Sequence, residues 1–138
     1  MVRSVYPVLM TEKLKESCEF YKTYFSFTET FSTDWYVSLR HPDGSELALI
    51  DARHETIPAP CRTVVNGMIL NIEVDDATEI YKDLCKKNKT IILMPIQDED
   101  YGQRHFMVQD PNQIVIDVIE EIAPGKEFQD SYVNGESS

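Results

Sequence analysis

The chain has 138 residues with 42% apolar and 10% aromatic side chains, a composition that indicates a globular protein. Its 24 acidic and 13 basic residues give a net charge of −11, and so acidic a surface argues against nucleic acid and membranes as partners. Three widely spaced cysteines, no apolar run near the roughly 20 residues of a membrane span and no recognisable signal peptide predict a cytoplasmic protein.

The first half of the sequence predicts a strand, a helix and further strands. Residues 4–10 read as a strand, and residues 14–25 as an amphipathic helix. The apolar face of this helix has helical spacing and comprises Leu14, Cys18, Tyr21 and Phe25. A His-Pro-Asp-Gly turn at residues 41–44 leads into an apolar strand at 47–50. Residues 51–65 show little periodicity and read as a linker.

The second half repeats this order. Residues 68–74 alternate as a strand, and Asp75 or Asp76 is expected to cap a helix that stops at Asn88. The apolar face of this helix comprises Ala77, Ile80, Tyr81, Leu84 and Cys85. An Asp-Pro-Asn-Gln turn at residues 110–113 precedes a strand at 114–118. The second half carries about six extra residues, which we expect at 97–102.

The repeat predicts an α+β fold of tandem βαβββ modules that form a curved, cup-like mixed sheet. The modules span about 1–55 and 66–121 within a single domain, and residues 122–138 form an acidic, partly loose tail. Phe128 and Tyr132 are four residues apart, so they can dock as a short helical turn. Alternation places Leu70 and Ile116 under the helices and turns polar neighbours toward a shared concavity.

This polar and aromatic strand face is too polar for an ordinary core, which predicts a ligand site. The candidate ligand-binding residues are Tyr6, Tyr36, Arg40, Glu46, Asn71, Glu73, Tyr101, Arg104, His105 and Asp117. Arg40 either forms a cross-strand ion pair with Glu46 or clamps an anionic group of the ligand. Alternation directs Trp35 to the helix side. His105 and Asp117 are the one acid–base couple that the sequence offers.

Several short motifs carry a resemblance to a known family. They are Leu-Lys-Glu-Ser-Cys-Glu-Phe-Tyr at 14–21, Val-Asp-Asp at 74–76, Gly-Gln-Arg-His-Phe at 102–106 and Asp-Pro-Asn at 110–112. In their order, over about residues 4–121, the chain resembles the vicinal-oxygen-chelate (VOC) superfamily of glyoxalases, bleomycin-resistance proteins and dioxygenases. Metal-dependent members hold their metal at positions that map to Tyr6, Ala48, Ile69 and Asp117. Ala48 and Ile69 have no donor atom, so we expect no metal and no other cofactor.

The resemblance implies two functions from different classes. The first is a homodimeric, bleomycin-resistance-like protein that binds a small organic molecule, a drug or a metabolite, in the cup without metal. The second is a VOC-type lyase, isomerase or dioxygenase that uses a non-standard metal or the His105/Asp117 couple as catalytic residues. We expect alanine at Arg40 or His105 to weaken ligand binding and to leave the fold intact.

Overall fold

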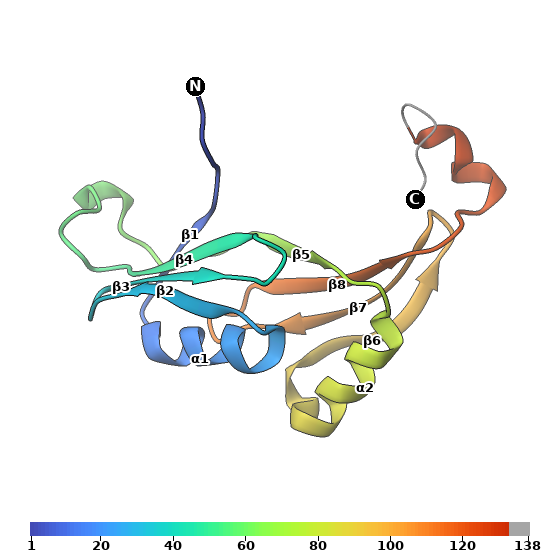
Figure 1. Ribbon diagram of the computed structural model, residues 1–138, viewed down its shortest axis with the longest axis horizontal. Helices are drawn as coiled ribbons and strands as arrows, with labels where there is room; N and C mark the ends of the chain where they lie inside the picture. The colour runs from blue at the N-terminus through green and yellow to red at the C-terminus, as the bar shows by residue number, and fades with distance from the viewer. Residues whose placement is uncertain (133–138) are drawn as a thin grey trace. The chain divides into compact units, whose positions relative to one another are not determined.

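The computed structural model describes residues 1–132, which form two compact units. The first unit comprises Met1–Gly67 with Asp110–Ile114, and the second comprises Met68–Gln109 with the chain from Val115 onward. Each unit contains one α-helix and one four-stranded sheet (Figure 1), which confirms the predicted α+β fold. Residues 133–138 of the predicted acidic tail lie outside the described residues. No helix within residues 1–132 is long and apolar enough to cross a membrane.

The sheet of the first unit has the strand order β1-β4-β3-β2. Its elements are β1 (Val8–Thr11), α1 (Leu14–Phe25), β2 (Thr28–Ser32), β3 (Tyr36–Arg40) and β4 (Glu46–Asp51). β1 runs parallel to β4, and the other neighbours are antiparallel. β1 is shorter than the predicted strand, because Pro7 has no N–H for the ladder and only its carbonyl oxygen accepts from Ala48, at 3.0 Å.

The helix α1 covers one face of this sheet (Figure 1) and has the predicted bounds. Cys18, Tyr21 and Phe25 of its apolar face are buried, together with Leu9 and Leu49 of the sheet. Apolar side chains at helical spacing meet apolar side chains at strand spacing, so this contact forms the core of the unit.

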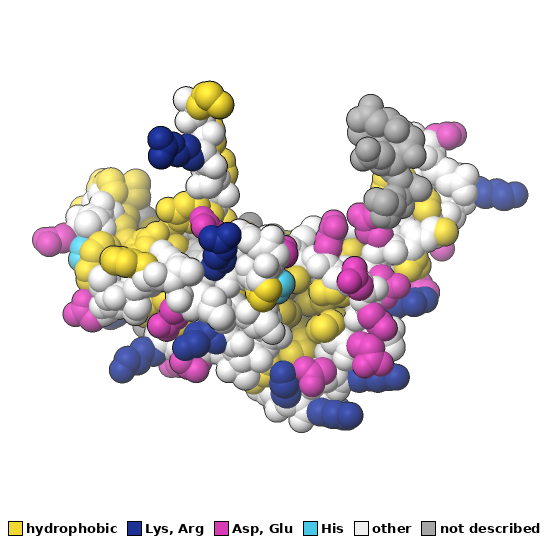
Figure 2. Space-filling view, in the orientation of Figure 1, with side chains coloured by type: hydrophobic (Ala, Val, Ile, Leu, Met, Phe, Trp, Pro, Cys, Tyr) yellow, Lys and Arg dark blue, Asp and Glu magenta, His cyan; other side chains and the backbone are white. Residues whose placement is uncertain are grey.

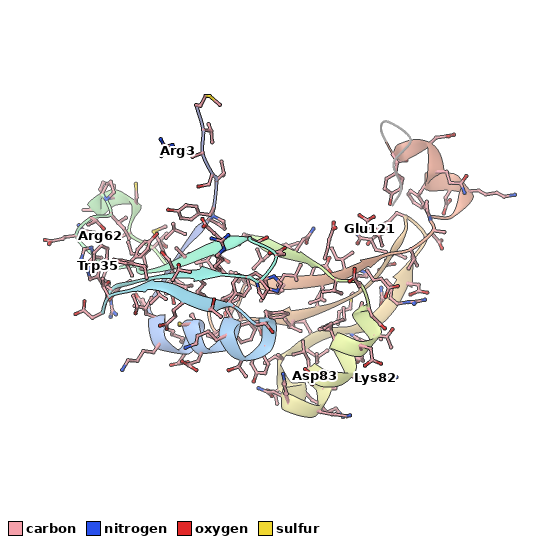
Figure 3. All side chains as sticks on the ribbon, in the orientation of Figure 1. Arg3, Trp35, Arg62, Lys82, Asp83 and Glu121 are labelled. Atoms are coloured by element: carbon pink, nitrogen blue, oxygen red, sulfur yellow. The ribbon has the colours of Figure 1, made fainter. Side chains whose placement is uncertain are left out.

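Residues 52–67 form a long loop beside the start of β3, and its 3-10 helix covers Ala59–Cys61. Trp35 does not join the α1 core as expected. Its indole stacks on the imidazole of His54 in this loop, with ring centroids 3.6 Å apart. Figure 3 shows Trp35 next to the part of the loop that carries Arg62. A loop without periodicity is therefore fixed by aromatic stacking and by Arg62, which donates to the carbonyl oxygen of Ile57 at 2.9 Å.

The second unit has the equivalent strand order, β5-β8-β7-β6. Its elements are β5 (Ile69–Glu73), α2 (Ala77–Asn88), β6 (Ile92–Glu99), β7 (Gln103–Gln109) and β8 (Val115–Glu121). Asp76 caps α2 by accepting from the backbone N–H of Glu79 at 3.1 Å, and the helix ends at Asn88, as predicted. Leu84, Phe106 and Ile116 are fully buried between α2 and the sheet, whereas Lys82 and Asp83 of α2 point to solvent (Figure 3).

The extra residues of the second unit lengthen a hairpin instead of forming a separate loop. β6 and β7 have eight and seven residues, whereas β2 and β3 have five each. The pairing of β6 with β7 contains two register shifts, between Ile92 and Met94 and between Met94 and Gln97. The hairpin therefore bulges before it reaches its tip at residues 100–102.

The chain after β8 packs on this hairpin tip. The backbone N–H of Ile122 donates to Gly102 at 2.9 Å, and the hydroxyl of Tyr132 donates to the carbonyl oxygen of Tyr101. The predicted helical turn is a 3-10 helix, Lys126–Ser131, and the ring of Phe128 meets that of Tyr101 at 6.0 Å. Gly102 has φ +105°, and a Cβ there would lie 2.9 Å from the Tyr132 hydroxyl. Glycine is therefore required at the tip.

The turn between β7 and β8, Asp110–Ile114, belongs to the first unit. Asp110 is 3% exposed and accepts a hydrogen bond from the hydroxyl of Tyr21 at 2.9 Å. The side chain of Asn112 donates to Ser17 at 3.0 Å and accepts from Thr11 at 2.5 Å. Thr11, Ser17 and Tyr21 are fully buried, so this network fastens the turn to α1.

Candidate functional site

The strands of the second unit alternate as the sequence predicted. Asn71, Met107 and Asp117 lie side by side in register, and His105 lies beside Ile119. These residues occupy one face of the sheet, because they hold matching positions on neighbouring strands. The other face carries Leu70, Phe106 and Ile116, and α2 packs on β7 and β8, which contribute Phe106 and Ile116.

His105 stands at the centre of this polar face and is held by two carboxylates. Its Nδ1 lies 2.7 Å from Oδ1 of Asp117, and its Nε2 lies 2.9 Å from Oε2 of Glu99. His105 is 2% exposed. Both ring nitrogens face acceptors, and only the imidazolium carries an N–H on each nitrogen. The geometry therefore defines a cluster of two carboxylates and one imidazolium, named here the Glu99–His105–Asp117 cluster.

The electrostatics of the cluster favour its charged form. Burial is the largest influence and lowers the pKa of His105, but the hydrogen bonds and charges of Glu99 and Asp117 outweigh it, so the pKa is raised. The hydrogen bond from His105, followed by one from Gln97, lowers the pKa of Glu99. Burial and then the charges of Glu99 and Asp117 raise the pKa of Tyr101, so its phenol lies in the field of both carboxylates.

These shifts predict how stability depends on pH. The raised pKa of His105 adds stability that is complete below the ordinary value of 6.5 and is lost as pH rises through the folded pKa. The lowered pKa of Glu99 adds stability that is present above 4.5 and is lost as pH falls through its folded pKa. We expect the gap in unfolding free energy between wild type and His105→Gln to be largest between pH 4.5 and 6.5. Urea unfolding from pH 4 to 9 measures this gap, and a gap that stays constant above pH 6.5 contradicts the charged cluster.

Acidic side chains are exposed around the hairpin of β6 and β7, on both faces of the sheet. Asp98, Asp100 and Glu121 are exposed near the hairpin, and the space-filling view shows acidic groups gathered over the second unit (Figure 2). Met94 and Met107 are half-buried register partners in β6 and β7, so apolar surface adjoins the charged groups. The face thus combines oriented polar atoms with apolar surface, which is typical of sites for small organic molecules.

The first unit carries a second polar face, on the side of its sheet away from α1. The phenols of Tyr6 and Tyr36 interact there, and burial followed by Tyr6 raises the pKa of Tyr36. A hollow of about 170 Å³ is lined by Tyr6, Thr30, Ser38, Leu39, Glu46, Leu47 and Ala48. Arg40 and Glu46 are register partners, yet no ion pair between them is found within residues 1–132. The predicted cross-strand ion pair is therefore absent from the described structure.

The remaining candidate residues of the second unit lie on different faces of the sheet. Asn71 and Glu73 are exposed on the same face as His105 and Asp117. Arg104 lies on the opposite face, where it binds Asp98 through two hydrogen bonds of 2.7 and 3.1 Å and reaches Glu120 at 3.8 Å. This placement removes Arg104 from the candidate face. Neighbouring residues of a strand point to opposite sides, so Arg104 and His105 cannot share one face.

Sequence reasoning missed Glu99. The sequence placed residues 97–102 among the extra residues of a loop, so strand alternation was not applied to Glu99, which is the last residue of β6. The one available signal was the run of polar residues Gln-Asp-Glu-Asp at 97–100, within the segment of extra residues.

A metal at the positions of metal-dependent relatives does not fit these residues. Ala48 is fully buried and offers only a methyl group, and Ile69 is 59% exposed and has no donor atom. Among the described residues, no group of three His, Cys, Asp or Glu side chains is arranged to hold a metal ion. The oxygens of Asp117 and Glu99 nearest to His105 are instead engaged by its imidazole.

The order of strand, helix and three strands in both units is the βαβββ module of VOC proteins. The chain belongs to the Glyoxalase/Bleomycin resistance protein/Dioxygenase superfamily, whose family model matches residues 3–118. No curated protein matches the chain.

Solved structures show the same fold. A superfamily member from Sphaerobacter thermophilus is 19% identical, with 87% of this chain and 98% of that chain covered and a TM-score of 0.68. A glyoxalase/bleomycin resistance protein/dioxygenase from Nocardioides is 21% identical, with 91% and 89% covered and a TM-score of 0.68. A glyoxalase-related enzyme from Fulvimarina pelagi is 19% identical, with 87% and 89% covered and a TM-score of 0.70. At these identities the likeness concerns the fold alone.

Proposed function

We propose that the protein binds a small organic molecule, a drug or a metabolite, without metal, and that the face around the Glu99–His105–Asp117 cluster contacts it. The observation that carries the proposal is the burial of a doubly paired histidine on an otherwise open sheet face. Burying charged groups costs several kcal/mol per ion, and apolar residues of similar size often replace such a cluster without loss of stability. Costly buried charges with shifted pKa values concentrate at functional sites.

The alternative is an enzyme in which His105 and Asp117 act as an acid–base couple. The 2.7 Å contact between them favours this reading, because a carboxylate on Nδ1 orients the ring for proton transfer through Nε2. Glu99 occupies Nε2 in the structure, so a substrate reaches that nitrogen only if Glu99 moves. The imidazolium carries a proton on each ring nitrogen, so it has no free lone pair with which to act as a base. Binding requires no proton transfer and is therefore the preferred function.

Native mass spectrometry of protein purified without chelators tests the metal-free proposal. We expect a homodimer, as the resemblance implies, with no stoichiometric divalent metal on either subunit. One equivalent of zinc, nickel, manganese or iron that is lost when Asp117 is changed to alanine would overturn it. A species of 15.9 kDa alone at micromolar concentration would contradict the dimer.

A further inference from the structure

The two carboxylates that hold His105 differ in how firmly they are fixed. The Asp117 side chain is 10% exposed and projects from β8, which is paired on both sides in its sheet. The Glu99 side chain is 27% exposed and is the last residue of the edge strand β6. Asp117 is therefore held within the paired strands of the sheet, whereas Glu99 lies at a strand end next to solvent.

Few contacts hold Glu99 on His105. Its Oε2 accepts one hydrogen bond from His105 at 2.9 Å and one from the exposed side chain of Gln97 at 2.6 Å. The register shifts of β6 precede it, and the tip at residues 100–102 follows it. Rotation of the Glu99 side chain into water breaks these two hydrogen bonds and leaves the contact between His105 and Asp117 in place.

Charge determines what can replace Glu99. The cluster contains one imidazolium and two carboxylates, so it carries one net negative charge. If a ligand carboxylate accepts from Nε2 of His105 while Glu99 turns to solvent, the charge on the imidazole and its number of hydrogen bonds stay the same. A cation cannot accept from Nε2–H, and a neutral carbonyl oxygen is a weaker acceptor for an imidazolium.

The surroundings suit the apolar part of an organic acid. The ring of Tyr101 is 39% exposed, and its phenol lies in the field of Glu99 and Asp117. Phe128 and the hydroxyl of Tyr132 fix Tyr101 from the C-terminal side. The apolar side chains of Met94 and Met107 are register partners in the same hairpin.

We propose that an organic carboxylate with an apolar body takes the place of Glu99 on Nε2 of His105, so that Glu99 is a built-in substitute for the ligand's acid group. This inference rests on the proposed ligand site and names its ligand class. Glu99 then competes with the ligand. The apparent affinity is the intrinsic affinity multiplied by the fraction of molecules in which Nε2 is free.

The test compares Glu99→Ala with Asp83→Ala, which removes one exposed carboxylate of α2, the helix that packs on the opposite face of the sheet. The change Glu99→Ala removes a group of the size of acetate. The probes are sodium acetate, sodium benzoate and neutral benzamide at constant ionic strength, and the readout is the His105 ring signals by NMR. If Glu99 occupies Nε2 in about nine molecules of ten, its removal tightens benzoate binding about ten-fold. Acetate should show the same gain, whereas Asp83→Ala should match wild type.

A second variant controls for the chance that Glu99→Ala disorders the hairpin tip. Glu99→Gln keeps the size of the side chain but is a weaker acceptor, so benzoate should bind it better than wild type and less well than Glu99→Ala. The proposal is overturned if Glu99→Ala gains no more affinity for benzoate than Asp83→Ala, or if benzamide gains as much as benzoate. In that outcome the broader binding function still stands if wild type binds other organic molecules at this face.

Discussion

Replacement of Asp110 by alanine should lower the free energy of unfolding by about 3–5 kcal/mol, because each buried donor left without a partner costs about 1–3 kcal/mol. The side chain of Asp110 accepts from the hydroxyl of Tyr21 and from the backbone N–H groups of Asn112 and Ile114, at 2.9, 2.8 and 3.0 Å. All three donors lose their acceptor in the variant. Urea unfolding followed by circular dichroism measures the loss.

Two control variants distinguish the loss of the buried hydrogen bonds of Asp110 from the loss of an acidic residue in a turn. Tyr21→Phe removes a single hydrogen bond to a charged group and should cost about 1.5–3 kcal/mol. Asp43→Ala changes an exposed acid in the turn at residues 41–44, where Asp43 accepts from the backbone of Ser45 at 2.8 Å, and should cost far less. Equal losses for Asp110→Ala and Asp43→Ala would show that the buried contacts do not fasten the turn.

Replacement of His105 by alanine should also lower the free energy of unfolding by about 3–5 kcal/mol, since it leaves a buried carboxylate without its counter-charge. Asp117 then lies next to an empty space, with its side chain 10% exposed. The sequence had placed His105 outside the core and predicted that its loss would spare the fold. The 2% exposure of His105 revises that expectation.

A double-mutant cycle isolates this interaction. Asp117→Ala should cost much less stability in the His105→Ala background than in wild type, because the charge that it removes is already unpaired. Chemical unfolding of the four proteins at pH 6 gives the coupling free energy. Additive losses would mean that the 2.7 Å contact contributes nothing to stability.

Local periodicity was sufficient to predict much of the fold. The bounds of α1, a cap at Asp75 or Asp76 and the end of α2 at Asn88 follow from side-chain spacing and capping chemistry, and the structure has the cap at Asp76 and the other bounds as predicted. The side of the sheet on which His105 and Asp117 lie follows from strand alternation in β7 and β8, where the pairing is regular. Both kinds of signal depend only on residues that are near in sequence.

Spacing along the sequence could not predict which distant residues meet, nor the course of the irregular strand β6. Ser17 and Tyr21 belong to one family motif and Asp110 and Asn112 to another, and the hydrogen bonds that join them span 89 to 95 residues. Their spacing along the chain does not show that they meet. Glu99 was missed for a different reason, because residues 97–102 were assigned to the extra residues of a loop, whereas Glu99 ends the strand β6. The cluster thus gained its third member only from the structure.

A small organic molecule should bind the sheet face around His105. The most direct measurement is an NMR titration of the wild-type protein with a library of drug-like and metabolite-like molecules, followed through the ring signals of His105 and Tyr101 and the side-chain amide of Asn71. We expect at least one compound to give saturable shifts at all three residues, and added zinc or manganese to have no effect on that binding. If no compound shifts these signals up to millimolar concentration, or if binding requires the metal, the proposed metal-free ligand site at this face is wrong.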